Sequence, residues 1–359
     1  MSVLIAIVVL CVIILVHELG HFGAAKLFKM NVPQFNLGMG PLLLKKNYKG
    51  TQYGLRLFPI GGSVLLGEDD TEESDDPNDF RNKPVWQRII VIGAGAFLNL
   101  VLGLILCIII YSVEPIPTTV VSAFGEEAVS NTGTSALRVG DRIVKVNGMN
   151  IVSASEIFYR MDNSLAKEGA SGNFAVYEFV VIRNKERVLL PEVKFAASPN
   201  PSDRGGMVYT RDFWIEPAEK TFLNVLNYSA RNAIGMGRII WLSLIDIIMG
   251  TYGLNEISGP VGIAGVVGDL TAQAVNIKEA VMTVVSLSAL ITINLGMVNL
   301  LPIPALDGAR ILFLSAEGIR RKPVNPAVEG MIHFVGFALL MLLILVVTFN
   351  DVRKMIVGG

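Results

Sequence analysis

Long apolar runs separated by polar stretches dominate the hydropathy pattern of the chain. Crossing the hydrocarbon core of a bilayer takes about 20 apolar residues in a helix. Four runs reach that length and predict transmembrane helices at 3–25, 89–113, 280–301 and 331–349. A fifth run, 238–250, is shorter and contains Asp246, so an amphipathic helix on the membrane surface is favoured there over a span.

The segments between these runs have different patterns. Alternating apolar residues punctuated by glycines predict a β hairpin pressed against the membrane at 35–66. The acidic run at 67–85 predicts a solvated, flexible linker because it is poor in apolar residues. Short β-rich runs with turn sequences predict one soluble domain at 115–217, followed by an amphipathic segment at 218–278.

Within the predicted soluble domain, residues 138–148 read RVGDRIVKVNG. A glycine-acid turn that opens a strand, and VNG that closes it, resemble the signature of bacterial PDZ domains. A generic small β domain is the alternative, because this is a single signature. The predicted fold is therefore a polytopic α-helical membrane protein with a membrane-associated β hairpin and an inserted PDZ-like domain, which separates membrane parts at 1–113 and 279–359.

Composition supports a membrane protein. Of the 359 residues, 52% are hydrophobic and only 17% are charged, and the mean hydropathy is +0.54, which is too apolar for an ordinary soluble enzyme. The formal net charge is −1, so nucleic-acid binding is not expected. Cys11 and Cys107 both lie in apolar runs, which gives no support to a disulfide framework or a cysteine zinc site.

Lysine and arginine are unevenly distributed among the loops, and short loops rich in them remain in the cytoplasm. Six follow the first apolar run between Lys26 and Arg56, and three more follow the third run at 320–322. These loops and the acidic linker are therefore expected inside, with the termini and the soluble domain outside. Arg353 and Lys354 are a weaker opposing signal. Because the first lysine follows the apolar run, we expect a retained helix and not a cleaved signal peptide.

Ionisable groups lie in the second half of the first apolar run, where they are energetically costly and usually functional. His17, Glu18 and His21 form an HExxH motif. Residues four apart lie on one face of a helix, so both imidazoles can reach one metal ion. Glu18 is rotated by about 100° from His17, beside the metal, where it can serve as a general base. The motif predicts a zinc site; helix packing or proton relay by the histidine pair is the alternative.

A catalytic zinc site takes three protein ligands and leaves one position open for water. Candidates for the third ligand are His333, the only other histidine, and the carboxylates of Asp246, Asp269, Asp307 and Glu317. Asp307 is favoured, because prolines break the helix before it, the next residue is a glycine, and its depth matches that of the HExxH histidines. His333 begins the fourth run on the same side and stays open, and a helix-capping role is the alternative for Asp307.

Several motifs together resemble one enzyme family. HELGH at 17–21, GAFLN at 95–99 and NLLPIPALDG at 299–308 look like the motifs of the site-2 protease family of intramembrane zinc metalloproteases. The bacterial branch that performs regulated intramembrane proteolysis fits best, and SGPVGIAG at 258–265 is similar to a segment that follows its PDZ region. The resemblance covers nearly the whole chain, with the motifs in the right order.

The resemblance implies a mechanism and a location. The 35–66 hairpin corresponds to the membrane-reentrant β-loop of the family, which is thought to pair with the unwound substrate. The family acts in the bacterial cell membrane on proteins with a single transmembrane helix, such as anti-sigma factors or remnant signal peptides. Some relatives carry two tandem PDZ domains, whereas this chain has room for one. By position, the zinc ligands are His17, His21 and Asp307, the catalytic base is Glu18, and the substrate-handling residues are Asn299, Pro302 and Pro304.

Two other classes of function fit part of the pattern. A membrane scaffold could bind exposed C-termini through the PDZ-like domain, with a structural zinc that needs His333 as a fourth ligand. A metal transporter would need further polar residues on the second and fourth spans, which offer almost none. Asn299 can serve either substrate or helix packing, and packing is favoured for Asn99 because GAGAF at 93–97 has the small-residue spacing of close helix contact.

Overall fold

The computed structural model describes residues 2–66, 76–168, 172–199, 207–251 and 275–357, with single positions at 259, 262, 265 and 268. The chain divides into two compact units, Met1–Leu106 with Ile257–Gly358 and Cys107–Glu256. Part of the predicted 67–85 linker and most of the 258–265 motif lie outside the described residues.

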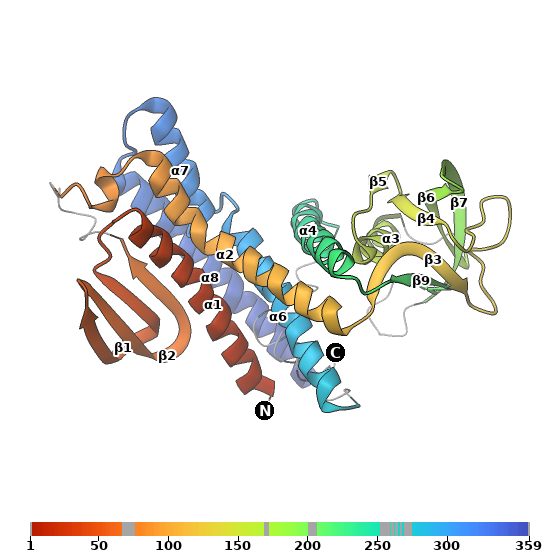
Figure 1. Cartoon of the computed structure of the whole chain (residues 1–359), viewed down its shortest axis with the longest axis horizontal. Helices are drawn as coiled ribbons and strands as arrows, with labels where there is room; N and C mark the ends of the chain where they lie inside the picture. Colours follow the sequence, from red (N-terminus) through yellow and green to blue (C-terminus); the bar gives the residue numbers. More distant parts are fainter. Residues whose placement is uncertain are drawn as a thin grey trace. The chain divides into compact units, whose positions relative to one another are not determined.

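Among the described residues, four long helices are apolar enough to cross a bilayer (Figure 1). They are α1 Ser2–Leu27, α2 Val85–Val113, α6 Ile277–Asn299 and α8 Pro326–Val357. All four overlap the predicted spans, so that prediction is confirmed, and the chain is a multi-pass membrane protein. The fourth helix extends well beyond the predicted 331–349.

Glycines bring α1, α2 and α6 close together. A Cβ atom at Gly20 of α1 would collide with the backbone of Ala94 in α2. A Cβ atom at Gly296 of α6 would lie 3.0 Å from the Ala96 carbonyl oxygen. Small residues allow such approach of membrane helices. The close contact predicted from GAGAF is present, and it brings the motif-bearing faces of the three helices together.

The predicted hairpin is present beside α1 (Figure 1). It consists of β1 Gln34–Tyr48 and β2 Thr51–Leu65. The start of β1 pairs with two parts of β2, because Phe35 is opposite both Tyr53 and Val64. Segment 34–37 therefore lies inside the sheet, whereas segment 62–65 pairs on one side only among the described strands.

Residues 76–84 differ from the flexible linker that was predicted. Asp79 is buried, and its carboxylate accepts a hydrogen bond from the Arg81 N–H at the start of the short 3-10 helix η1 Phe80–Asn82. Phe80 packs against a buried cluster that includes Met30 and Val91. The acidic composition of the segment predicted a flexible linker, because it does not indicate that one aromatic side chain, Phe80, is packed against the membrane helices.

The third transmembrane helix ends before the LDG motif, contrary to the prediction that one element carries both. α6 ends at Asn299, and a separate helix α7 spans Asp307–Arg320. Pro302 and Pro304 lie in the intervening loop, where they have no backbone N–H to continue a helix. Asp307 is therefore the first residue of a short helix and not the end of a long one.

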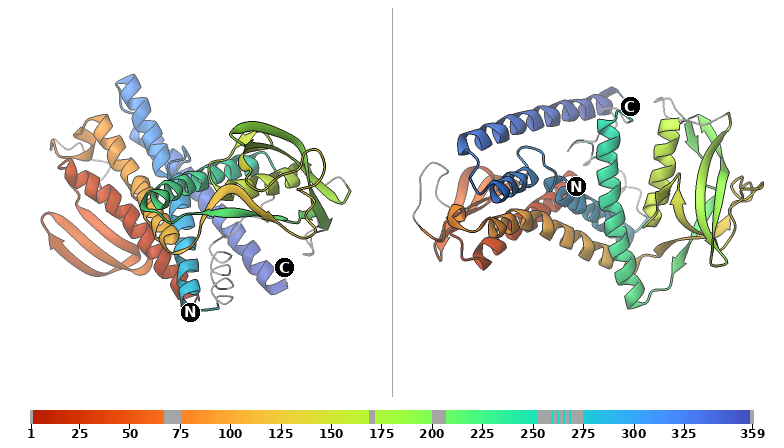
Figure 2. Two further views of the ribbon diagram at one scale, coloured as in Figure 1. Left: turned by 45° about the vertical axis from the view of Figure 1, so that its right-hand side comes forward. Right: turned by 90° about the horizontal axis from the view of Figure 1, so that it is seen from above.

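The second unit contains one antiparallel sheet with strand order β8-β7-β6-β4-β3-β9, and β5 pairs with β4. Its helix α3, Ala154–Glu168, covers one face of the sheet (Figure 2), where Ile157 and Met161 pack on Phe179 and Phe195. The sheet lies within the β-rich block predicted at 115–217 up to its last residue, Ala218, whereas the compact unit is larger and runs from Cys107 to Glu256. The strands are β3 Ile116–Phe124, β4 Arg142–Val146, β5 Met149–Asn150, β6 Phe174–Arg183, β7 Glu186–Pro199, β8 Met207–Tyr209 and β9 Phe213–Ala218.

The glycine-acid turn of the 138–148 signature is a structural element of this domain. Gly140 has a φ of 89°, which favours glycine. Asp141 is buried and accepts hydrogen bonds from the Arg138 N–H at 2.8 Å and the Arg183 guanidinium at 2.7 Å. The hydrogen bonds that the Arg183 guanidinium donates to the Asp141 carboxylate raise the pKa of Arg183. The turn therefore ties the loop before β4 to the end of β6.

The helix after the sheet has its polar side buried. α4 spans Phe222–Ile248 and is longer than the 238–250 helix predicted from hydropathy. The hydroxyl of Tyr159 and the amide of Asn163, both on α3, donate to the buried Asp246 carboxylate. Exposed α4 residues include large apolar side chains such as Trp241. The buried residues of α4 are Ser229, Asn232, Gly235, Gly237 and Asp246.

Candidate metal centre

The two histidines of the HExxH motif point to one side of α1. Both are buried, and their Nε2 atoms are 3.1 Å apart. The His21 Nδ1–H donates to the Val91 carbonyl on α2 at 2.9 Å. This hydrogen bond fixes the ring and leaves the Nε2 lone pair free, which is the usual arrangement of a metal-binding histidine.

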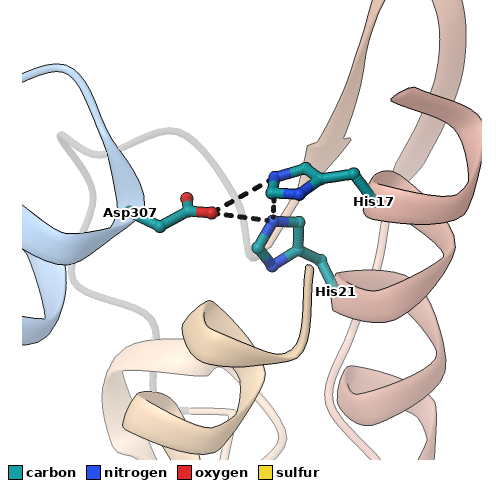
Figure 3. A group of neighbouring side chains, drawn as sticks. All are labelled: His17, His21 and Asp307. Atoms are coloured by element: carbon teal, nitrogen blue, oxygen red, sulfur yellow. Dashed lines mark hydrogen bonds and ion pairs between the residues drawn. The ribbon is translucent and has the colours of Figure 1, made fainter. Parts of the chain in front are cut away.

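Asp307 faces the histidine pair from the start of α7 (Figure 3). Its Oδ2 atom is 3.2 Å from His17 Nε2 and 3.4 Å from His21 Nε2. The adjacent Gly308 permits this approach, because a Cβ atom there would collide with the carbonyl oxygens of Leu300 and Leu301. The structure therefore brings together three residues that were predicted from segments nearly 300 positions apart.

The spacing of these three atoms fits a zinc ion. A tetrahedral zinc about 2.0 Å from each ligand requires neighbouring ligand atoms to be about 3.3 Å apart. The three separations observed are 3.1, 3.2 and 3.4 Å. Asp307 Oδ2 is buried and makes no hydrogen bond. Burial raises the pKa of Asp307, but the neighbouring imidazoles of His17 and His21 outweigh this effect. The pKa of Asp307 therefore lies below its ordinary value, and the carboxylate is ionised, as a metal ligand must be.

The other candidates for the third ligand have different partners. His333 Nδ1 accepts a hydrogen bond from the Ala305 N–H at 3.0 Å. Glu317 pairs with the Arg88 guanidinium, and Asp246 pairs with α3 in the other unit. Asp269 lies outside the described residues. The capping alternative for Asp307 is wrong, because Leu306 is the N-cap of α7 and no side chain caps the helix. Among the described residues, the one metal-binding group of this kind is His17, His21 and Asp307.

Asn99 contacts the site, although sequence reasoning favoured a packing role for it. It is fully buried, and its Nδ2 atom lies 3.3 Å from His17 Nδ1 while its Oδ1 has no partner. Rotating the amide by 180° would let Oδ1 accept from His17 Nδ1–H, which is the tautomer that frees Nε2 for a metal. A Cβ atom at Gly95, one turn earlier, would collide with His21 Nε2. In the sequence, the one indication of this contact is that Gly95 and Asn99 are four residues apart and therefore lie on the same face of α2.

The remaining predicted residues surround this group. Glu18 lies against the hairpin, because a Cβ atom at Gly62 would be 2.6 Å from its Cγ. The Asn299 amide nitrogen is 3.5 Å from His17 Nε2. Pro302 is exposed in the loop before α7, and Pro304 is partly buried there. A base, an amide donor and an exposed loop thus share one region with the three ligand atoms.

Comparison with known proteins decides the family. Residues 5–343 match the family model described as Peptidase family M50. The chain belongs to peptidase family M50. A protein of Clostridium acetobutylicum, provisionally named a zinc metalloprotease, is 34% identical to this M50 chain over 98% of its residues and 97% of the relative. Zinc metalloprotease RasP of Shouchella clausii is 31% identical over 97% of this chain and 98% of the relative. The regulator of sigma-W protease RasP of Bacillus subtilis is 26% identical over 99% of each chain.

Membership in M50 confirms the resemblance to the site-2 protease family. The M50 chain is a zinc metalloprotease of the membrane that performs intramembrane proteolysis on membrane proteins. The scaffold and the metal transporter are not favoured by these relatives.

Proposed function

We propose that His17, His21 and Asp307 hold the catalytic zinc of this protease and that Glu18 is its general base. The observation that carries this proposal is the convergence of three ligand atoms, from two helices, at spacings of 3.1 to 3.4 Å beside Glu18. When bound there, zinc supplies Lewis acidity and a water of lowered pKa.

The residues of the chain supply the proton transfers. Glu18 accepts a proton from the attacking water and then gives it to the departing amine of the cleaved peptide. The Asn299 side-chain N–H, 3.5 Å from His17 Nε2, is within reach of an oxygen that develops charge next to the ligand group. Asn99 keeps His17 oriented by holding its second ring nitrogen.

We propose that the hairpin presents the substrate as an added strand. A transmembrane helix must unwind before its carbonyls can be attacked, and the freed backbone groups then need partners in lipid. Segment 62–65 pairs on one side only and lies against Glu18. An extended substrate segment paired with this edge would place its backbone beside the base. We also assign Pro302 and Pro304 to substrate handling, because they lie in the loop that leads to Asp307.

The substrates we propose are membrane proteins with a single transmembrane helix. The Bacillus subtilis relative is named as the regulator of sigma-W protease, which favours anti-sigma factors as one substrate class. Remnant signal peptides are a second substrate class, because they too present a single helix in the bilayer. A helix without partners can enter the site laterally, whereas a helix packed in a bundle cannot.

We propose that the β domain is PDZ-like and lies outside the cytoplasm at the membrane surface of the bacterial cell. Support comes from the helix that follows it. Lys220 Nζ donates to the carbonyl of Val113 at the end of α2, and Asn232 Nδ2 lies 3.9 Å from Cys107 Sγ in the same span. α4 thus packs beside lipid-spanning residues, and its exposed apolar face has the character of an interfacial helix. The glycine-acid turn, in which Gly140 has positive φ and Asp141 is buried, supports the PDZ assignment.

Accessible cysteines test this orientation. Lys185→Cys adds a thiol to the exposed β6–β7 turn, and Lys49→Cys adds a matched thiol to the exposed hairpin turn. In intact bacterial cells, a membrane-impermeant maleimide is expected to label Lys185→Cys and not Lys49→Cys, and permeabilised cells should label both. The opposite pattern would place the domain in the cytoplasm and refute the proposal.

The activity is tested with purified protein in detergent and a panel of single-span peptides. We expect cleavage within the apolar segment of some peptides, complete loss of cleavage after zinc chelation, and recovery when zinc is added back. The matched panel contains the same segments fused to a second transmembrane helix, which should be cut poorly. Equal cleavage of both panels would refute the single-span preference, and cleavage that survives chelation would refute the metal mechanism.

A further inference from the structure

The loop between α6 and α7 contains a turn that its sequence does not favour. The Leu306 N–H donates to the Ile303 carbonyl at 3.1 Å, with Pro304 and Ala305 between them. Ala305 has a φ of 76°. Proline at the second position and positive φ at the third are the pattern of a type II turn, in which the third position normally needs glycine. Alanine adopts that conformation at an energetic cost, so other contacts must hold it.

Helix α8 supplies those contacts. The Ala305 N–H donates to His333 Nδ1 at 3.0 Å. A backbone N–H can only donate, so Nδ1 carries the lone pair and the ring proton is on Nε2. One turn later, a Cβ atom at Gly336 would collide with Pro304. A hydrogen-bond acceptor and a glycine gap on α8 therefore act on two consecutive residues of the strained turn.

These two contacts join α8 to the loop before Asp307. Most α8 side chains are exposed, and those that face the rest of the described unit form a narrow stripe. Phe334 and Val335, beside His333, are both exposed. Two residues of this stripe, His333 and Gly336, contact the loop that precedes Asp307.

We propose that His333 is a positioning residue that holds the 303–306 turn in its strained form, and that this turn aims Asp307 and the exposed Pro302 at the site. The inference rests on the proposed function. His333 acts through Ala305, which is two residues before Asp307 in the chain. It was considered above as a metal ligand, but its Nδ1 is engaged by the loop; its role is to fix a neighbouring ligand.

A set of four variants tests this role. His333→Leu keeps an apolar side chain of similar bulk but removes the acceptor, and His333→Asn keeps an acceptor near the Nδ1 position. The double variant His333→Leu with Ala305→Gly removes the acceptor but supplies a residue that adopts positive φ freely. Phe334→Leu, on the exposed side of α8, is the matched control. Measurements are kcat/KM on one single-span peptide and zinc affinity by competition with a chelator.

We expect His333→Leu to lower kcat/KM about tenfold, which corresponds to about 1.4 kcal/mol, with a parallel loss of zinc affinity. His333→Asn and the glycine double variant should each recover most of the loss, and Phe334→Leu should match the wild type. A packing role gives the reverse order, because leucine would be tolerated better than asparagine. Wild-type values for His333→Leu, or no recovery in the double variant, would overturn the inference. A wild-type chain that neither binds zinc nor cleaves would instead refute the proposed function.

Discussion

Replacing Glu18 with glutamine is expected to abolish detectable cleavage while zinc binding is retained. Glutamine has nearly the same shape as glutamate but cannot accept the proton of the attacking water. General acid–base catalysis contributes about 100- to 10,000-fold in rate, so kcat should fall by at least that range. The three ligand atoms of His17, His21 and Asp307 are untouched by this change. Zinc content by mass spectrometry and peptide cleavage, measured on the same preparation, check both halves of the expectation.

The matched control for this variant is Glu186→Gln, which makes the same chemical change at the exposed first residue of β7 in the β domain. It should leave both zinc content and cleavage unchanged. Cleavage retained by Glu18→Gln would remove Glu18 as the base. Loss of zinc from Glu18→Gln would instead mean that the glutamate helps to bind the metal, which its contact with Gly62 of the hairpin does not suggest.

The HExxH part of the site could be predicted because it is local. His17 and His21 are neighbours on any α-helix, whatever the rest of the chain does. Asp307 was harder, since its position depends on where α6 stops and on the packing of Gly308 against the end of that helix. Asp307 was selected from the sequence because prolines interrupt the helix before it and because its expected depth in the membrane matches that of the histidines.

Asn99 shows why some contacts of the site were not predicted. Its spacing from Gly95 indicated a packed helix face, and the face is packed as expected. Which side chain occupies that face is decided by the rotation of α1 relative to α2, and a single sequence carries no signal of that rotation. The same holds for His333, whose partner Ala305 is 28 residues away in a turn with no regular pattern.

The four membrane helices followed from hydropathy, but two details of the fold did not. The separate helix α7 has only 14 residues. It is shorter than the run of about 20 apolar residues that predicts a transmembrane helix, so hydropathy did not indicate it. The structured residues 76–84 depend on one aromatic side chain, Phe80, within an acidic stretch. In both places a few tertiary contacts outweigh the average composition of the segment.

Replacing Asp307 with alanine is expected to remove both zinc and activity. A zinc site that loses one of three protein ligands keeps only the histidine pair, and even the loss of a residue that merely orients a ligand costs about 10- to 100-fold in metal affinity. We therefore expect zinc affinity to fall by about 100-fold or more, and cleavage to disappear at ordinary zinc concentrations. Chelator competition and peptide cleavage in detergent measure the two effects.

The informative comparison is between Asp307→Ala and His333→Asn, because these two residues competed as the third ligand. His333→Asn keeps the hydrogen bond to Ala305 and should retain zinc, whereas Asp307→Ala leaves the two imidazoles 3.1 Å apart without a carboxylate. Undiminished zinc affinity in Asp307→Ala would contradict the ligand assignment. If affinity were lost in His333→Asn instead, the imidazole of His333 would have to leave Ala305 to reach the metal, and the strained turn would have no holding contact. The 303–306 turn thus distinguishes the two candidates for the third ligand, because it occupies the His333 imidazole and leaves the Asp307 carboxylate beside the histidine pair.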